Sequence, residues 1–396
     1  MQKILLLIAS LFYFNFILAE NEIKSWQGIH ETPLSRLEQQ FAEPPVEFAN
    51  HVIWGWEGKM DKKTICNDLD SIKKKGFRAV IFEAGYKLPF KYLSEEWFKA
   101  IRTGVLEAKK RGMKVWIIDE GKYPSGFAGG KFSQERPDLR MQALVIGDTI
   151  QIKRGEVMTN HKIAQEIISA VAVSTSGAPN RTVAINNGEI SFNAGLDDWK
   201  ILLVKSDFRT AVTRAVNNPN GGKDATNSLC DYLNPVAVQQ FIDWTHEQYK
   251  KYLGKELGTT VLGFRGDEPD YAHLPWTPSI VQTFKDTKGY NPTPYLASFF
   301  TTSPTIQEQR VKADYWDVWS SLFATHFFKL QADWCAANGV AHITHLNKEH
   351  EMPACVKAEG DYFRNLSKVQ IPGVDAIWNQ IWPGTLNDFP KLASSV

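Results

Sequence analysis

The sequence predicts an α/β fold of the (β/α)8 TIM-type barrel class, interrupted by an inserted antiparallel β domain. Three observations indicate this fold. Short apolar segments alternate with helical segments in both halves of the chain, which is typical of a parallel sheet. Several apolar segments end in acidic residues, as barrel strands do at the face that binds substrate. Between residues 141 and 215, β-type segments and turn signals replace this alternation.

The first part of the predicted barrel covers residues 49–140 and contains three strands. Its helices are recognised by apolar residues at helical spacing, with Gly76 as a C-cap and Ser94 as an N-cap. The expected strands and helices are, in order, 51–56, 61–76, 77–82, 94–112 and 113–118. The third strand delivers Asp119 and Glu120 at its carboxyl end, where charged groups meet water or substrate.

The inserted β domain is predicted for residues 141–215. The dipeptide Asn187-Gly188 is a strong hairpin-turn signal, and the Ser-Thr-Ser-Gly segment at 174–177 is a second loop. A closing strand is expected at 199–204. These features predict antiparallel hairpins.

The second part of the barrel is predicted for residues 216–396. Asn234 caps a helix that has Pro235 in its first turn, and Val261 begins the strand that runs into Asp267 and Glu268. A long helical segment and two further strands are expected at 309–338, 341–346 and 373–378, followed by part of one more helix. This count gives six strands of eight. We therefore expect an incomplete barrel from a chain that is truncated at its C-terminus.

The N-terminus and the composition restrict the class of protein. Residues 1–19 read as a secretory signal peptide and 20–48 as a polar leader, so we expect a secreted or periplasmic protein without a membrane anchor. Lys and Arg number 45 against 44 for Asp and Glu, which disfavours nucleic acid as a partner. The 13 tryptophans give weak support for a carbohydrate ligand. The four scattered cysteines are expected to be free thiols, with a Cys335–Cys355 bridge as the alternative.

The acidic strand ends suit glycoside hydrolysis, which needs a carboxylic acid and a second carboxylate. Glu268 is the candidate general acid. The candidates for the second carboxylate are Glu349, Glu351 and Asp375, and Glu349 is favoured over Glu351 because it lies nearer the strand end. The neighbouring histidines could bind a metal or be polar residues satisfied within a pocket, and the second interpretation is favoured; they are His342, His345 and His350.

The glycine-rich loop at 122–130 can approach a ligand closely because its backbone turns tightly. It lacks the GxGxxG arrangement before a helix, so a dinucleotide is excluded as ligand. Ser125 has no nucleophile-elbow context. The loop is therefore expected to bind substrate.

The ordered motifs resemble glycoside hydrolase family 106, the α-L-rhamnosidase family, over about residues 45–396. The motifs are Trp54-Gly-Trp56, Asp119-Glu120 followed by Tyr-Pro-Ser-Gly-Phe-Ala-Gly-Gly, Gly266-Asp-Glu-Pro269, Pro275-Trp-Thr-Pro278, Gly289-Tyr-Asn291 and Pro372-Gly-Val-Asp375. The resemblance implies an inverting, exo-acting hydrolase with a barrel catalytic domain and a calcium ion near the sugar. It also implies secretion for the use of plant or algal polysaccharide.

Carried over to this sequence, the resemblance implies Glu268 as catalytic acid, with a looser match for Glu349. Substrate contacts are expected from Trp54, Trp56, Asp119, Glu120, Tyr123, Ser125, Asp267, His345 and Asp375. Calcium ligands are expected among loop carboxylates, with Glu351 and Asp361 as the candidates. Family members continue beyond Ser395 and carry another active-site glutamate there. The alternative function is therefore a truncated, catalytically inactive sugar-binding remnant, and the sugar is left open between rhamnose, another deoxyhexose and a uronic acid.

Overall fold

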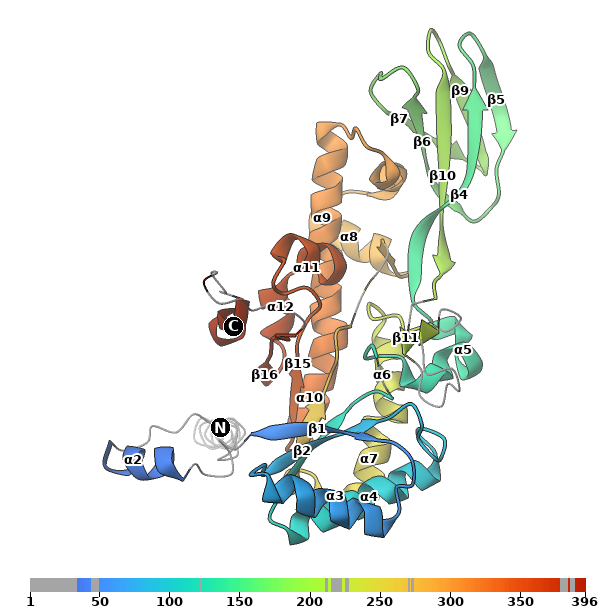
Figure 1. Ribbon diagram of the computed structural model, residues 1–396. Helices are drawn as coiled ribbons and strands as arrows, with labels where there is room; N and C mark the ends of the chain where they lie inside the picture. The colour runs from blue at the N-terminus through green and yellow to red at the C-terminus, as the bar shows by residue number, and fades with distance from the viewer. Residues whose placement is uncertain are drawn as a thin grey trace, which may run out of the picture.

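A computed structural model describes residues 34–43, 50–121, 123–210, 213–214, 223–224, 228–269, 271, 274–377, 384 and 389–396. Its centre is a six-stranded sheet in the order β1-β2-β3-β13-β15-β16, in which every neighbouring pair is parallel (Figure 1). The strands are β1 (His51–Trp56), β2 (Ala79–Ala84), β3 (Lys114–Ile118), β13 (Val261–Arg265), β15 (Ala341–Thr344) and β16 (Ile371–Pro372). Because parallel strands all end at the same edge, the residues after β3, β13 and β15 come together there.

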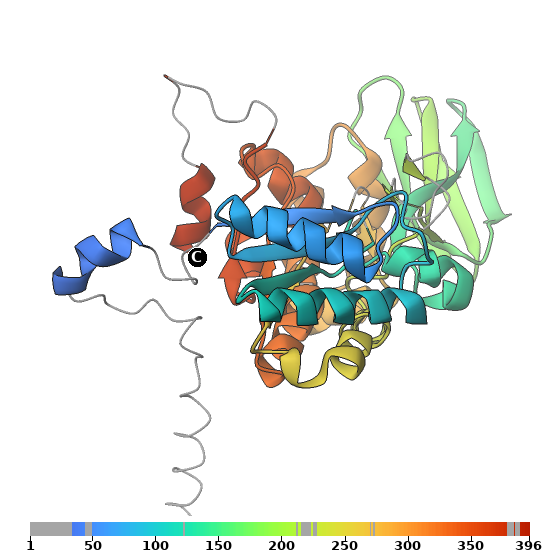
Figure 2. The same ribbon diagram turned by 60° about the horizontal axis from the view of Figure 1, so that its bottom comes forward.

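Helices cover one face of this sheet. They include α3 (Lys62–Lys74), α4 (Glu95–Lys110) and α7 (His246–Leu253), and Figure 2 shows α3 and α4 lying side by side over the strands. Asp61 and Ser94 cap α3 and α4 by accepting backbone N–H bonds from Thr64 and Trp97. Beneath them, the fully buried rings of Trp56, Phe82 and Trp97 form part of one continuous core.

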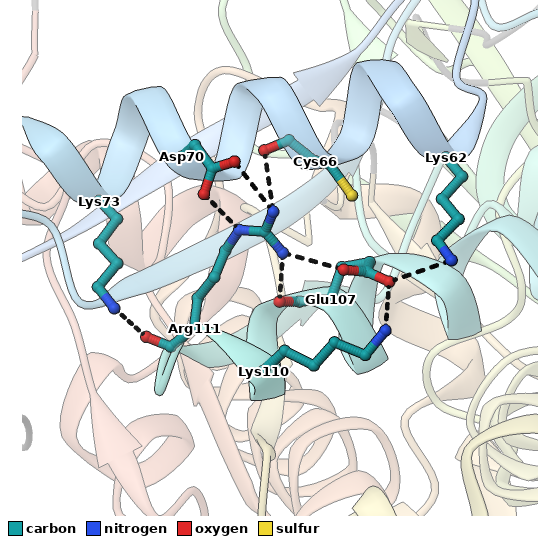
Figure 3. A network of polar contacts seen from close by, with 7 residues as sticks. All are labelled: Lys62, Cys66, Asp70, Lys73, Glu107, Lys110 and Arg111. Atoms are coloured by element: carbon teal, nitrogen blue, oxygen red, sulfur yellow. Dashed lines mark hydrogen bonds and ion pairs between the residues drawn. The ribbon is translucent and has the colours of Figure 1, made fainter.

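An ion-pair network joins α3 to α4 (Figure 3). The Arg111 guanidinium donates to both carboxylate oxygens of Asp70, at 2.7 and 3.0 Å, and to the Glu107 carboxylate at 3.0 Å. Lys110 also donates to Glu107, at 2.7 Å. The hydrogen bonds from Lys110 and Arg111 hold the pKa of Glu107 down to about 2. This network fixes the spacing of the two helices above the sheet.

The inserted segment forms antiparallel sheets that stand apart from the parallel sheet in Figure 1. The larger sheet has the order β14-β4-β10-β6-β7, in which β14 is added from outside the inserted segment, and a smaller sheet has the order β5-β9-β8. The bounds are β4 (Gln142–Ile152), β5 (Val157–Lys162), β6 (Ile167–Ser174), β7 (Arg181–Val183), β8 (Ile185–Asn186), β9 (Glu189–Asn193), β10 (Trp199–Phe208) and β14 (Pro275–Trp276). A short pair, β11 (Thr213–Arg214) and β12 (Lys223–Asp224), follows. The expected antiparallel β structure is confirmed.

The remaining helices include α2 (Leu34–Ala42), which stands apart from the sheet near the N-terminus in Figure 1. The others are α5 (Lys131–Glu135), α6 (Pro235–Trp244), α8 (Ile280–Lys288), α9 (Ile306–Leu322), α10 (Lys329–Ala337), α11 (Met352–Glu359), α12 (Tyr362–Leu366) and α13 (Leu392–Ser395). The predicted long helix is α9 and α10 joined by a π-helix, η6 (Phe323–Phe328). Shorter 3₁₀ segments complete the set: η2 (Ala128–Gly130), η3 (Pro137–Leu139), η4 (Gly254–Glu256), η5 (Thr293–Phe300) and η7 (Phe389–Lys391).

The structure changes three expectations from the sequence. The sixth strand is Ile371–Pro372 rather than 373–378: residues 373–377 have no strand pairing, and Trp378 lies outside the described residues. The helix expected to start at Asn234 breaks at Thr245, which separates α6 from α7. The described sheet is open, with β1 and β16 at its edges, so the fold is a mixed α/β architecture.

Other sequence expectations concern the thiols and the N-terminus. All four cysteines are free, and three of them are buried, so the alternative Cys335–Cys355 bridge is wrong. The predicted signal peptide lies outside the described residues, as does most of the leader. None of the described helices combines the length and apolar character needed to cross a bilayer.

Candidate functional site

The turn after β13 carries the two adjacent carboxylates. Glu268 has a φ of 26°, a left-handed value that is rare for a residue with a side chain, and Pro269 follows it. Strained backbone of this kind collects at functional sites because the surrounding structure must hold it in place. Asp267 and Glu268 keep 23% and 18% of their side chains exposed, so a ligand can reach both carboxylates.

His345, just after β15, lies at the centre of the acidic group. Its Nε2 atom is 3.4 Å from Asp267 Oδ1, 3.8 Å from Glu268 Oε1 and 3.7 Å from Asp375 Oδ2. Only 4% of the imidazole is exposed. Three segments distant in sequence therefore bring their charged groups to one point at the carboxyl edge of the sheet.

Opposing electrostatic effects act on the pKa of His345. Burial lowers the pKa of His345, but interaction with Glu268 and the negative charge of Asp267 oppose that effect, and the net shift is upward. Burial in turn raises the pKa of Asp267, although the charge of His345 opposes this increase. The imidazole lies within 3.8 Å of all three carboxyl groups and can orient them.

Glu349 is buried beside this group, with 3% of the residue exposed. Its Oε1 accepts hydrogen bonds from the backbone N–H groups of Leu346, at 3.0 Å, and Asp375, at 3.4 Å. Burial raises the pKa of Glu349 to about 7. A carboxyl group with a pKa near neutrality can donate or accept a proton under ordinary conditions.

A buried hydrogen-bond relay holds the Asp267-Glu268 turn in place. The Ser125 hydroxyl donates to Asp119 Oδ1 at 2.7 Å and accepts the backbone N–H of Asp267, also at 2.7 Å. Tyr232, which the sequence analysis did not identify, donates its hydroxyl proton to the Ser125 carbonyl at 2.5 Å. Asp119 and Ser125 are 0% and 1% exposed, and their hydrogen bonds support the turn from within the protein.

Glu120 organises the glycine-rich loop. Its carboxylate accepts backbone N–H bonds from Gly121 at 2.6 Å, from Gly129 at 2.9 Å and from Ala128. Burial raises the pKa of Glu120 to about 7. Gly126 has a φ of 92°, and a Cβ there would lie 2.5 Å from the Tyr232 ring, so only glycine fits.

The glycine-rich loop also carries Tyr123, which contacts the loop after β15. This side chain is half-buried, and its hydroxyl accepts a hydrogen bond from Asn347 Nδ2 at 3.4 Å. Of the residues expected to contact substrate, the structure gathers Asp267, His345 and Asp375 directly, while Tyr123 lies on an adjoining loop. The sequence contains no local signal for Tyr232, because its role depends on contact between distant segments.

The structure corrects the substrate role expected for two tryptophans. Trp56 is 0% exposed and packs its ring against Phe82 and Trp97, with centroids 5.0 and 5.8 Å apart. Trp54 is 9% exposed and belongs to the same core. Their rings stabilise the packing of helices on the sheet and have no face free for a sugar.

The structure places the two expected metal ligands outside the acidic group around His345. Glu351 is exposed at the start of α11, and Asp361 caps α12 by accepting the backbone N–H of Arg364. Within the part of the chain that the structure describes, the group of ligand atoms close enough to share a cation is Glu268, His345 and Asp375, which lie within 4.8 Å of one another. This group could hold a metal ion. One nitrogen and two carboxylates do not match the all-oxygen shell that calcium prefers.

A parallel α/β sheet whose carboxyl edge gathers exposed and buried carboxylates around one histidine has the features of a glycoside hydrolase. The model of glycoside hydrolase family 106, described as alpha-L-rhamnosidase, matches residues 156–389, more than half of the chain. The chain therefore belongs to this family, and the resemblance noted in the sequence is confirmed.

Two comparisons with individual proteins extend this result. The chain is 23% identical to a protein of Formosa agariphila named "Putative beta-glucuronidase", over 92% of the chain and 34% of that protein. It also matches the fold of a rhamnosidase from Novosphingobium sp. PP1Y, with a TM-score of 0.60 at 14% identity, over 84% of the chain and 48% of that structure. The chain thus spans about a third of the first protein and about half of the second.

Proposed function

We propose that the protein hydrolyses terminal α-L-rhamnosides or closely related glycosides, with Glu268 as general acid and Glu349 as general base. The observation that supports this proposal most strongly is the convergence of Asp267, Glu268 and Asp375 on His345, with the buried Glu349 beside them. Acid-base hydrolysis of a glycosidic bond requires two carboxyl groups of this kind.

In the proposed mechanism, Glu268 donates a proton to the glycosidic oxygen as the bond to the anomeric carbon breaks. The Glu349 carboxylate accepts a proton from a water molecule, whose oxygen attacks that carbon from the opposite face and inverts its configuration. His345, whose Nε2 lies 3.8 Å from Glu268 Oε1, orients the Glu268 carboxyl group. Asp119 and Ser125 fix the turn that carries Glu268, and no step uses a metal ion.

The experiment is hydrolysis of 4-nitrophenyl α-L-rhamnoside, followed by the anomeric proton signals of the released sugar. We expect turnover with the inverted anomer formed first, and a loss of at least about 100-fold in kcat for Glu349→Gln, within the range of general acid-base catalysis. Sugar binding without turnover would contradict the hydrolase and support a sugar-binding protein. Formation of the retained anomer would contradict the role of Glu349 as base.

The carbohydrate could be a component of plant or algal polysaccharide reached outside the cytoplasm, since the N-terminal segment reads as a signal peptide. Processing near residue 19 during export from a bacterial host would support this location, and an intact N-terminus in the cytoplasm would contradict it.

We also propose that the parallel sheet is part of a (β/α)8 barrel. Its strands follow chain order, and the face opposite α3 and α4 carries a separate apolar layer of Ile81, Trp116, Ile118 and Ala341. Inward-pointing layers of this kind fill barrel interiors. Pairing of β1 and β16 with further parallel strands in an experimental structure would support this proposal, and an open sheet with unpaired edges would contradict it.

A further inference from the structure

A cavity of about 640 Å³ lies between the loop after β13 and the helices α9 and α11. Its volume falls in the range of ligand-binding pockets, about 300–1,000 Å³. None of the groups assigned to acid-base chemistry lines it. The cavity is therefore a second place where the protein could hold part of a substrate.

Aromatic side chains form the apolar part of the cavity wall. Four of its ten lining residues are aromatic, among them Tyr271, Phe299 and Trp316. Phe299 and Trp316 are half-buried, so part of each ring remains open to a ligand. Flat rings of this kind suit the apolar face of a sugar ring.

The charged side chains among the described lining residues are basic. Lys312, Lys348 and Lys357 contribute to the lining, and within the described ranges no acidic residue does. All three lysines are exposed, and none forms an ion pair with any acid in the described ranges. Lys312 Nζ lies 5.7 Å from the centre of the Trp316 ring, so charge and stacking surface occur together. Lysines converging on an otherwise apolar cavity favour an anionic ligand.

Two lining residues connect the cavity to the catalytic loops. Lys348 is adjacent in sequence to Glu349, and Tyr271 follows Glu268 by three residues, which limits the distance between their Cα atoms to about 11 Å. The backbone N–H of Tyr271 also donates to the Ala358 carbonyl at 3.2 Å, which joins the loop after β13 to α11. The loops that carry Glu268 and Glu349 therefore also carry residues of the cavity wall.

We infer that this cavity binds an acidic sugar unit, one that carries a carboxylate or a sulfate ester, within the carbohydrate substrate. The inference rests on the proposed function, to which it adds the chemical class of the neighbouring sugar. The ring stacks on the aromatic wall while the anionic group is held by the lysines. The protein then selects acidic polysaccharides over neutral ones.

Calorimetric titration of the intact protein carrying Glu268→Gln tests this inference without cleavage of the ligand. The probes are a trigalacturonide, a sulfated neutral trisaccharide and an unsulfated neutral trisaccharide. The double variant Lys312→Gln/Lys357→Gln removes two cavity charges. Its matched control, Lys63→Gln/Lys200→Gln, removes two exposed charges on α3 and β10, away from the cavity lining.

We expect an acidic probe to bind at least 10-fold more tightly than the neutral one and to weaken as salt increases. The cavity double variant should weaken it by about 5- to 30-fold, and the control by less than 2-fold. Binding of the trigalacturonide alone identifies a carboxylate, and binding of the sulfated probe alone identifies a sulfate ester. Equal binding of acidic and neutral probes, no binding of any probe, or equal effects of the two double variants would overturn the inference.

Hydrolysis of the aryl rhamnoside by the unmodified protein separates the two proposals. Salt-sensitive binding of an acidic probe without turnover would contradict the hydrolase and retain the acidic-sugar site. Turnover without selective binding of an acidic probe would support the hydrolase and contradict the acidic-sugar site.

Discussion

Substitution of Ser125 by alanine tests whether the buried relay positions the catalytic acid. The change removes the hydroxyl that links Asp119 to the backbone N–H of Asp267, both at 2.7 Å. An unsatisfied buried polar group costs about 1–3 kcal/mol, and two groups lose their partner here. We therefore expect the free energy of unfolding to fall by about 2–6 kcal/mol, measured by urea denaturation.

The same substitution should also impair catalysis beyond its effect on stability. Without its anchor the Asp267-Glu268 turn can relax from the strained φ of Glu268, and a displacement of about 1 Å at a catalytic group can cost 100-fold in rate. We expect kcat on an aryl rhamnoside to fall by about 10- to 100-fold, with KM changed by less than about 3-fold.

Ser169→Ala is the matched control. Ser169 is also 1% exposed, and its hydroxyl accepts the backbone N–H of Ala297 at 3.0 Å, within the antiparallel region. It should lower stability by about 1–3 kcal/mol and leave kcat unchanged. If Ser125→Ala lost stability but retained full kcat, or if both variants lost kcat equally, the relay would have no positioning role.

Three further changes test other parts of the structure. Burial raises the pKa of Asp231 to about 7, so its carboxyl destabilises the fold as pH rises from about 4 to 7. The free energy of unfolding of Asp231→Asn should therefore increase relative to that of the unmodified protein as pH rises through this interval, by at most about 4 kcal/mol. If chemical denaturation showed the same pH dependence for both proteins, this expectation would be contradicted. Arg111→Met removes the shared partner of Asp70 and Glu107. We expect the free energy of unfolding to fall by about 1–3 kcal/mol, with kcat unchanged. An unchanged midpoint of urea denaturation would contradict a stabilising role for this network. The ligand atoms around His345 are nitrogen and oxygen. We therefore expect Zn²⁺ to raise the melting temperature of EDTA-treated protein at lower concentrations than Ca²⁺ does. If Ca²⁺ acted at lower concentrations than Zn²⁺, calcium would be the ion that fits the site.

Local signals in the sequence were sufficient to predict much of the parallel sheet. The strand at 51–56 is found with the same bounds, and Ser94 and Asn234 cap helices as expected, because strand patterning and capping depend on neighbouring residues. The predicted start of the sixth strand was two residues too late, because pairing with β15 determines where this strand begins. Gly373 still donates to the Thr344 carbonyl, but the ladder ends at Pro372.

The chemical role of several predicted residues depended on burial, which the sequence does not contain. Asp119 and Ser125 were identified at the correct strand end, yet both face inward and support the acidic turn. Trp56 resembled a sugar platform, but its position on β1 points the ring toward α4 and the core. The convergence of three carboxylates on His345 required the register between β13 and β15, because that register brings the two loops together.

The central claim is that Glu268 is the general acid of this site. The most direct test is the rate of hydrolysis of aryl α-L-rhamnosides whose leaving groups differ in their need for protonation. A leaving group that needs no proton, such as 2,4-dinitrophenolate, makes a general acid dispensable. We predict that Glu268→Gln retains activity on the dinitrophenyl glycoside within about 10-fold and loses at least about 100-fold on the phenyl glycoside. Equal losses on both substrates, or full activity on the phenyl glycoside, would contradict the claim.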